Sequence, residues 1–210
     1  MATIPQQSSF APEPEPAWDV ALLFPYQGGW DEEDYLALHT NQLVEFTDGC
    51  VEVLPMPTTS HQFIVQFLHA TLLAFVESRK LGKVIFAPLR IRLRAGLFRE
   101  PDVIFIARER YSQIGEKYWR GADLVMEVVS EDAESHDRDY VKKRRDYAEA
   151  GIQEYWIVDP QVERITVLVL DGKQYRVHGE FAPKEQASSV LLSGLTVDVS
   201  ATFAAGKKLD

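Results

Sequence analysis

Apolar residues recur at two different spacings along the chain, and the change of spacing marks out the elements. Helical spacing runs through residues 61–80, HQFIVQFLHATLLAFVESRK, and predicts a helix that ends at Gly82 as its C-cap. Residues 137–151, DRDYVKKRRDYAEAG, predict a second helix closed by its final glycine. Residues 31–39, DEEDYLALH, predict a short helix with an acidic first turn and Asp31 as its N-cap.

Runs of alternating or β-branched residues predict strands around these helices. Asp-Gly pairs at 48–49 and 171–172 indicate hairpins within residues 43–55 and 163–177. Further strands are predicted within residues 88–94, 98–107, 121–132 and 154–160. A helical connection is expected between the strands of residues 98–107 and 121–132.

The order of the central elements is helix, three strands, helix and strand, with one hairpin before them and one after. This order predicts an α/β (α+β) domain with a mixed central sheet flanked by helices. Residues 1–17, MATIPQQSSFAPEPEPA, hold almost no core-forming residues and are expected to form a disordered or extended arm. A single domain is expected over residues 18–210.

Composition narrows the class of protein. The chain has 210 residues, of which 46% are apolar and 26% charged, as is typical of a water-soluble globular protein. No apolar run approaches the roughly 20 residues of a membrane-spanning helix, and the first residues do not resemble a signal peptide. A single cysteine excludes an intramolecular disulfide and a cysteine-cluster zinc site. We therefore expect a cytoplasmic protein with no membrane partner.

The net charge of −10 argues against polyanion binding by the surface as a whole, but the basic residues are clustered. Residues 79–99 contain seven basic residues and no acidic one, and a second cluster spans residues 138–145. These clusters form either ordinary solvated faces or a surface that contacts nucleic-acid phosphates. The residues assigned to such a surface are Arg90, Arg92, Arg94, Lys142 and Arg144.

Two carboxylates stand in apolar strands. Glu127 lies at the centre of GADLVMEVVSED, and Asp102 follows Pro101 at the entrance of another strand. If the two strands pair antiparallel, the carboxylates converge, and like charges in such proximity repel unless a proton or a divalent cation is shared. One Asp, one Glu and a backbone carbonyl, here that of Val128, suit Mg²⁺ or Mn²⁺. The alternative is a pair of buried carboxylates held by backbone N–H groups.

A Pro-Asp followed about 25 residues later by a Glu in an apolar strand resembles the pattern of the PD-(D/E)XK nuclease superfamily. Four segments together resemble a large bacterial family of restriction-endonuclease-like proteins: LVEFTDGCVEVLPMPTTSH, FREPDVIF, ADLVMEVVSED and RDYVKKRRDYAEAGIQEYWIVDP. The resemblance covers roughly residues 18–200. It implies the restriction-endonuclease-like fold and a metal-dependent phosphodiesterase site, with Asp102 and Glu127 as its acids.

The chain departs from the superfamily pattern two residues after Glu127, where Val129 stands in place of the expected lysine. The resembling family has a lysine followed four residues later by a tyrosine in the next helix, which here are Lys143 and Tyr147. A lysine on that helix has the reach to replace the missing one. The alternative for Lys143 is a surface ion pair with Asp139 at i and i+4.

Two further residues match the resembling family. Glu45, in the first hairpin, is either a third ligand to the metal or water, or a side chain facing solvent. His61, at the start of the long helix, either contacts phosphate or another ligand, or is an exposed side chain near the helix cap.

The resulting hypothesis is a Mg²⁺- or Mn²⁺-dependent nuclease that hydrolyses nucleic-acid phosphodiesters, with DNA as the expected substrate, through metal-activated water. Because of Val129, a catalytically inactive nuclease fold that binds nucleic acid or protein is the alternative. A hydrolase of small phosphoesters is a third possibility. Resemblance to restriction enzymes also implies a homodimer, for which the C-terminal hairpin offers an edge.

Overall fold

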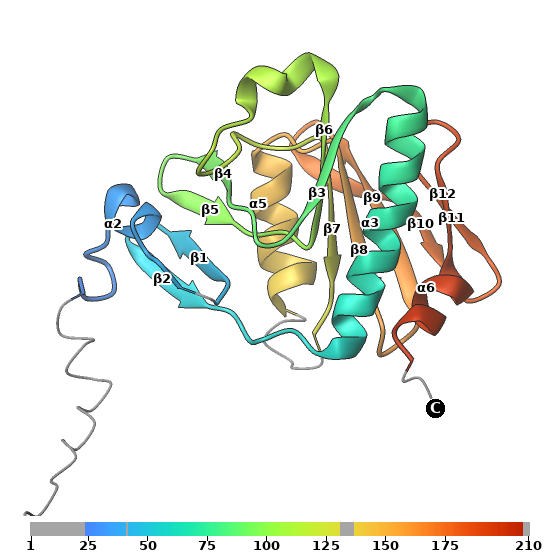
Figure 1. Cartoon of the computed structure of the whole chain (residues 1–210), viewed down its shortest axis with the longest axis horizontal. Coiled ribbons are helices and arrows are strands. Elements are labelled where there is room, and N and C mark those ends of the chain that lie inside the picture. The colour runs from blue at the N-terminus through green and yellow to red at the C-terminus, as the bar shows by residue number, and fades with distance from the viewer. Residues whose placement is uncertain (1–23, 41, 131–136, 208–210) are drawn as a thin grey trace, which may run out of the picture.

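The computed structural model describes residues 24–40, 42–130 and 137–207. The predicted N-terminal arm, residues 1–17, lies outside the described residues. Within the described ranges no helix is both long enough and apolar enough to cross a membrane. The described chain folds into a mixed α+β structure, which confirms the predicted fold class (Figure 1).

A six-stranded mixed sheet forms the centre of the fold, with the strand order β10-β9-β8-β7-β6-β3. Its strands are β3 (Gly82–Phe86), β6 (Val103–Ala107), β7 (Leu124–Val128), β8 (Glu154–Asp159), β9 (Arg164–Asp171) and β10 (Gln174–Phe181). Strands β7 and β8 are parallel, whereas the other neighbouring pairs are antiparallel. The antiparallel pairing of β6 with β7, on which the predicted convergence of carboxylates depends, is therefore confirmed.

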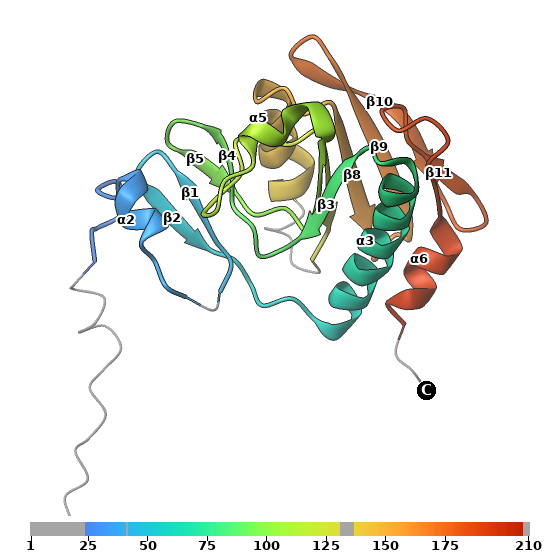
Figure 2. The same ribbon diagram turned by 45° about the horizontal axis from the view of Figure 1, so that its top comes forward.

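Helices cover both faces of this sheet. The long helix α3 (Thr59–Arg79) and the short helix α6 (Val199–Ala205) pack on one face, and α5 (Lys143–Glu149) packs on the other (Figures 1 and 2). Alternate residues of a strand point to opposite faces, so β6 places Val103 and Phe105 in the core under α3 and Ile104 in the core under α5. By the same alternation Asp102 and Glu127 belong to the face that α5 covers.

A smaller sheet lies beside the first, with the order β2-β1-β5-β4 (Figure 2). It consists of β1 (Val44–Thr47), β2 (Cys50–Val53), β4 (Ile91–Arg94) and β5 (Leu97–Arg99), and α2 (Glu32–Leu36) packs on it. Tyr35, Phe46 and Phe98 are fully buried between α2 and this sheet, with ring centroids 5.2 to 6.2 Å apart. The predicted first hairpin and the N-cap of α2 at Asp31 are both confirmed.

Some boundaries differ from the prediction. Helix α3 ends at Arg79, and its C-cap is Lys80, which adopts a left-handed conformation with φ 55°. Gly82, the predicted C-cap, instead begins β3, a strand that was not predicted. A Cβ on Gly82 would lie 2.1 Å from the carbonyl oxygen of Ile106, so close strand pairing explains this glycine. The single strand predicted for residues 98–107 is divided at Pro101 between the two sheets.

One connection is less regular than predicted, and the C-terminal part of the described chain contains elements that were not predicted. The segment between β6 and β7 contains a 3₁₀ helix, η1 (Arg108–Gln113), where a helix was expected. The second hairpin, β9 and β10, is confirmed. After it come three elements that were not predicted: β11 (Gln186–Ser188) and β12 (Thr196–Asp198), which form a small antiparallel pair, and then α6.

Candidate active site

The two strand carboxylates meet where β6 begins and β7 ends. Asp102 precedes β6, Glu127 lies in β7, and the register places Val103 opposite Met126. Asp102 Oδ2 accepts a hydrogen bond of 2.8 Å from the backbone N–H of Val128. Asp102 is 7% exposed and Glu127 is 3% exposed, so both carboxylates are held in an environment that disfavours their charge.

Lys143 reaches these carboxylates from the other side. It is the first residue of α5, and its side chain is buried. The ammonium Nζ lies 2.9 Å from Glu127 Oε1, 3.4 Å from Glu45 Oε1 and 3.5 Å from Asp139 Oδ1. Val129, in the place where the superfamily pattern has lysine, is 1% exposed and packs in the core under α5. The cation near Glu127 thus comes from the helix.

A widened helical turn precedes Lys143. Residues Arg138–Lys142 form a π-helical turn, η2, which continues directly into α5. Asp139 in this turn is 3% exposed and Lys143 is 2% exposed. The alternative of a solvated surface pair is therefore wrong, because the shared face of Asp139 and Lys143 is the buried one. Single π-turns inside helices occur frequently at functional sites.

Glu45 comes to the same cluster from β1 of the smaller sheet. It is 1% exposed, so the alternative that it faces solvent is wrong. Its Oε1 accepts a hydrogen bond of 3.3 Å from the N–H of Glu100, and its Oε2 lies 3.5 Å from Arg99 Nη1. Arg99 also binds Asp146 of α5 at 2.7 Å. This buried chain of charges ties the smaller sheet to the helix that carries Lys143.

His61 closes the site from α3. Its backbone N–H is held by the N-cap Thr58 at 3.2 Å, which fixes the first turn of the helix. The ring Nε2 lies 3.0 Å from the carbonyl oxygen of Val128 and 3.3 Å from Asp102 Oδ2. The side chain is 10% exposed, so the alternative of an exposed cap-region residue is wrong. Within the described residues Nδ1 is buried without a hydrogen-bond partner.

Tyr147 also contributes a side chain to the site, although no role was predicted for it from the sequence. It lies one turn after Lys143 in α5, and its hydroxyl donates a hydrogen bond of 2.5 Å to Glu127 Oε1. Its ring is fully buried and packs edge-on against Tyr155 at a centroid distance of 5.1 Å. Its four-residue spacing from Lys143 was the signal that could have placed both side chains on Glu127.

The electrostatics of the cluster reflect an excess of acid. Burial raises the pKa of the Glu127 carboxyl, the ammonium of Lys143 lowers it, and nearby carboxylates such as Asp139 raise it again, giving a pKa of about 8. Burial also raises the pKa of Asp139, against the opposing effect of Lys143. Burial would lower the pKa of Lys143, but the surrounding carboxylates reverse this and raise it.

His61 and Asp102 behave as a pair. Burial would lower the pKa of His61, but the charge and hydrogen bond of Asp102 outweigh it and raise the pKa. Burial would raise the pKa of Asp102, but His61 and the Val128 N–H lower it below its usual range. Asp102 is thus the carboxylate that stays ionised, and Glu127 is the one that retains a proton near neutral pH.

Three of the arginines assigned to nucleic acid, Arg90, Arg92 and Arg94, each contact a carboxylate of this chain. Their partners are Glu100 for Arg90 at 3.2 Å, Glu32 for Arg92 at 2.9 Å and Asp48 for Arg94 at 2.7 Å. In the second cluster, Lys142 is exposed, whereas Arg144 is partly buried and donates to the carbonyl of Tyr175 at 3.1 Å. Of the five predicted contact residues, Lys142 is therefore the one that is exposed and forms no ion pair with a carboxylate in the described part of the chain.

Comparisons with known proteins agree with this fold. No curated protein matches the chain. A crystal structure of a "putative nuclease belonging to DUF820" from Anabaena variabilis ATCC 29413 superposes with a TM-score of 0.70 and 17% sequence identity, covering 83% of this chain and 98% of that one. At this identity the likeness concerns the fold. The family model Uma2, described as "Putative restriction endonuclease", matches residues 32–200. The predicted resemblance is thereby confirmed, and the chain belongs to the Uma2 family.

Proposed function

We propose that this protein is a Mg²⁺- or Mn²⁺-dependent nuclease that hydrolyses DNA phosphodiester bonds. The observation that carries the proposal is the 2.9 Å contact between Lys143 Nζ and Glu127 Oε1. The superfamily site needs a cation beside the second acid, and α5 supplies it where β7 has only Val129. The departure in the motif is therefore compatible with an active site.

The donor set of the site suits a divalent cation. Asp102, Glu127 and the carbonyl of Val128 would hold it, and all three are oxygen donors of the kind that Mg²⁺ prefers. No cluster of three or more His, Cys, Asp or Glu side chains arranged to hold a metal occurs among the described residues. Water would complete the coordination, because Mg²⁺ in proteins usually keeps several waters. Buried oxygens of Glu45 and Asp139 accept no hydrogen bond in the described structure, and each has a cation at the longer distance of 3.5 Å. A bound ion would lower the pKa of water and stabilise charge on the phosphate.

The side chains of the chain itself would orient the reactants. The Lys143 ammonium would donate to the attacking water or to a phosphate oxygen, and Glu45 would fix its position. Tyr147 would hold Glu127 in one rotamer through its hydroxyl. His61 would hold the Val128 carbonyl and Asp102 in register at the opposite side of the site.

The test is cleavage of supercoiled plasmid DNA with Mg²⁺ or Mn²⁺. Asp102→Ala, Glu127→Ala and Lys143→Met should each reduce the rate at least about 100-fold. The first two substitutions remove a proposed metal ligand, and the third removes the lysine ammonium. Lys173→Met, at an exposed lysine in the β9–β10 turn, is the matched control and should cleave like the wild type. Circular dichroism verifies that every variant folds.

The outcomes separate the hypotheses. Cleavage that survives the three site substitutions would come from a contaminant, and metal titration by calorimetry without binding would contradict the enzyme hypothesis. Metal-independent DNA binding without cleavage would support the inactive binding module instead. Hydrolysis of a chromogenic phosphodiester but not of DNA would indicate a small-phosphoester hydrolase. The predicted homodimer stays a prediction, for which light scattering of the purified protein is the measurement.

A further inference from the structure

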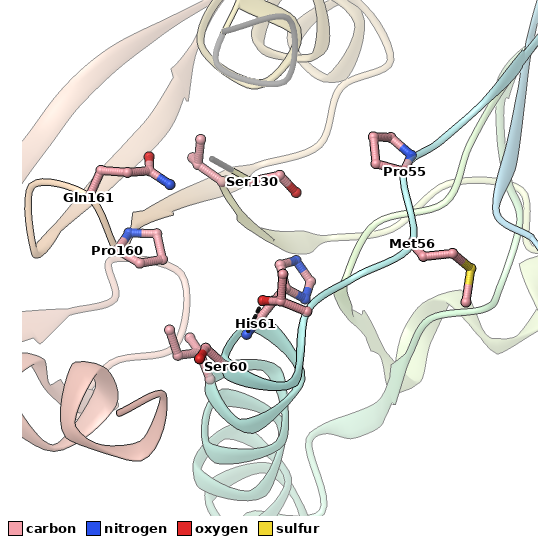
Figure 3. Close-up of a pocket in the computed structure, with 10 residues that line it drawn as sticks. Pro55, Met56, Ser60, His61, Ser130, Pro160 and Gln161 are labelled. Atoms are coloured by element: carbon pink, nitrogen blue, oxygen red, sulfur yellow. Dashed lines mark hydrogen bonds between the residues drawn. The ribbon is translucent and has the colours of Figure 1, made fainter. Parts of the chain in front are cut away.

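A second cavity adjoins the candidate active site, between the N-terminal end of α3 and the ends of β7 and β8. Its volume is about 310 Å³. Figure 3 shows Gln161 and Ser130 facing the first turn of α3, with Pro55 and Met56 on the opposite side. No step of the proposed hydrolysis uses this cavity.

The cavity lies next to the site and shares lining residues with it. His61 and Ser130 line both this cavity and the small one, of about 30 Å³, that contains Asp102, Glu127 and Lys143. His61 therefore separates the two, with Nε2 toward Asp102 and the ring forming a wall of the larger cavity (Figure 3). Because the two cavities share His61 and Ser130, a nucleotide whose phosphate lay at the carboxylates would have its adjoining group next to the larger cavity.

The chemistry of the lining selects the kind of group. The described residues that line it include no Lys, Arg, Asp or Glu, and the imidazole of His61 is already paired with Asp102 at 3.3 Å. Ile64, Val129 and Pro160 supply apolar walls, while Ser130 and Gln161 supply hydrogen-bonding groups at the rim. Apolar walls with a few polar groups are typical of sites for small neutral ligands, and 310 Å³ lies at the small end of their range. A Gln amide can pair with the edge of a base.

We propose that this cavity receives one unstacked nucleobase next to the scissile phosphate. The inference rests on the proposed nuclease function and adds a substrate preference to it. A base inside a continuous duplex is stacked and cannot enter a cavity, so it must first be flipped out. Single-stranded, frayed or distorted DNA avoids that unstacking energy, and the protein should bind it more tightly than continuous duplex.

The test measures binding with cleavage switched off. The full-length protein is titrated, in EDTA, into a short fluorescein-labelled single strand and into the corresponding duplex, with anisotropy as the readout. Gln161→Trp fills the rim of the cavity and should weaken single-strand binding about tenfold. Val162→Trp is the matched control, because it places the same side chain at the next position, which is 59% exposed and does not line the cavity.

A second readout follows the base itself. A duplex with one 2-aminopurine should brighten on binding to the wild type and to Val162→Trp, because this base fluoresces more strongly when unstacked, and it should not brighten with Gln161→Trp. Equal binding by the two tryptophan variants would overturn the inference, even if both cleave DNA. Weakened binding by Gln161→Trp alone would support it, even if no protein cleaves DNA and the proposed function fails.

Discussion

Replacement of Glu127 by glutamine should stabilise the metal-free protein while removing its activity. Glutamine keeps the shape of the side chain and removes a carboxyl whose pKa is raised from 4.5 to about 8, first by burial. At pH 7 the unfolded chain ionises this group and the folded chain keeps it protonated. Each pKa unit corresponds to 1.36 kcal/mol, so this pKa difference lowers the free energy of unfolding of the wild type by about 3 kcal/mol at pH 7.

Loss of the contact with Lys143 offsets part of this gain. The ammonium keeps Glu45 at 3.4 Å and Asp139 at 3.5 Å, so it is not left as an unpaired buried charge. We expect Glu127→Gln to raise the free energy of unfolding by about 1 to 3 kcal/mol at pH 7.

The dependence on pH has a definite sign. Between pH 4.5 and about 8 the folded wild type binds more protons at Glu127 than the unfolded chain does, so this group makes stability fall as pH rises. The advantage of Glu127→Gln should therefore grow across that window and level off above it.

The assay is urea denaturation in EDTA at several pH values, with Glu180→Gln as control. Glu180 is an exposed partner of Arg164, and its substitution should change stability by no more than about 0.5 kcal/mol. A Glu127→Gln protein that is less stable than the wild type throughout would refute the reasoning, since it would mean that Glu127 is ionised and required by Lys143.

Three other substitutions test the site and its surface. Tyr147→Phe removes the hydrogen bond to Glu127 and should lower the free energy of unfolding by about 1 kcal/mol, measured by thermal melting. It should also lower the cleavage rate about tenfold in a plasmid-nicking assay. An unchanged rate would show that the hydroxyl has no positioning role. Lys142→Ala should reduce the salt dependence of DNA binding by about one counterion. Arg94→Ala should change the salt dependence little, because Asp48 already neutralises that guanidinium. A larger effect of Arg94→Ala than of Lys142→Ala would show that Arg94 contacts DNA.

The acids of the candidate site could be found from the sequence because they depend on strand periodicity. A strand buried on both faces has a recognisable composition, and the antiparallel pairing of neighbouring strands brings Asp102 toward Glu127. The burial of Glu45 could not be found in this way. A hairpin has two faces, and the face that is covered depends on contact with α5, which is distant along the chain.

Gly82 and Asp139 show the same limit. A glycine after a helix fits a C-cap as well as a close strand approach, and only the carbonyl of Ile106 decides between them. Helical spacing places Asp139 and Lys143 on one face, but the buried side of that face is set by the π-turn and by the sheet beneath it.

The delivery of the lysine from α5 also affects how such proteins are recognised. A pattern that demands lysine two residues after the acid passes over this chain, although a lysine nitrogen lies 2.9 Å from that acid. Because the cation is supplied from α5, position 129 needs no charged side chain, and Val129 is 1% exposed in the core under α5. A spatial template of two carboxylates and one ammonium, indifferent to the strand or helix that carries each, would recover this site.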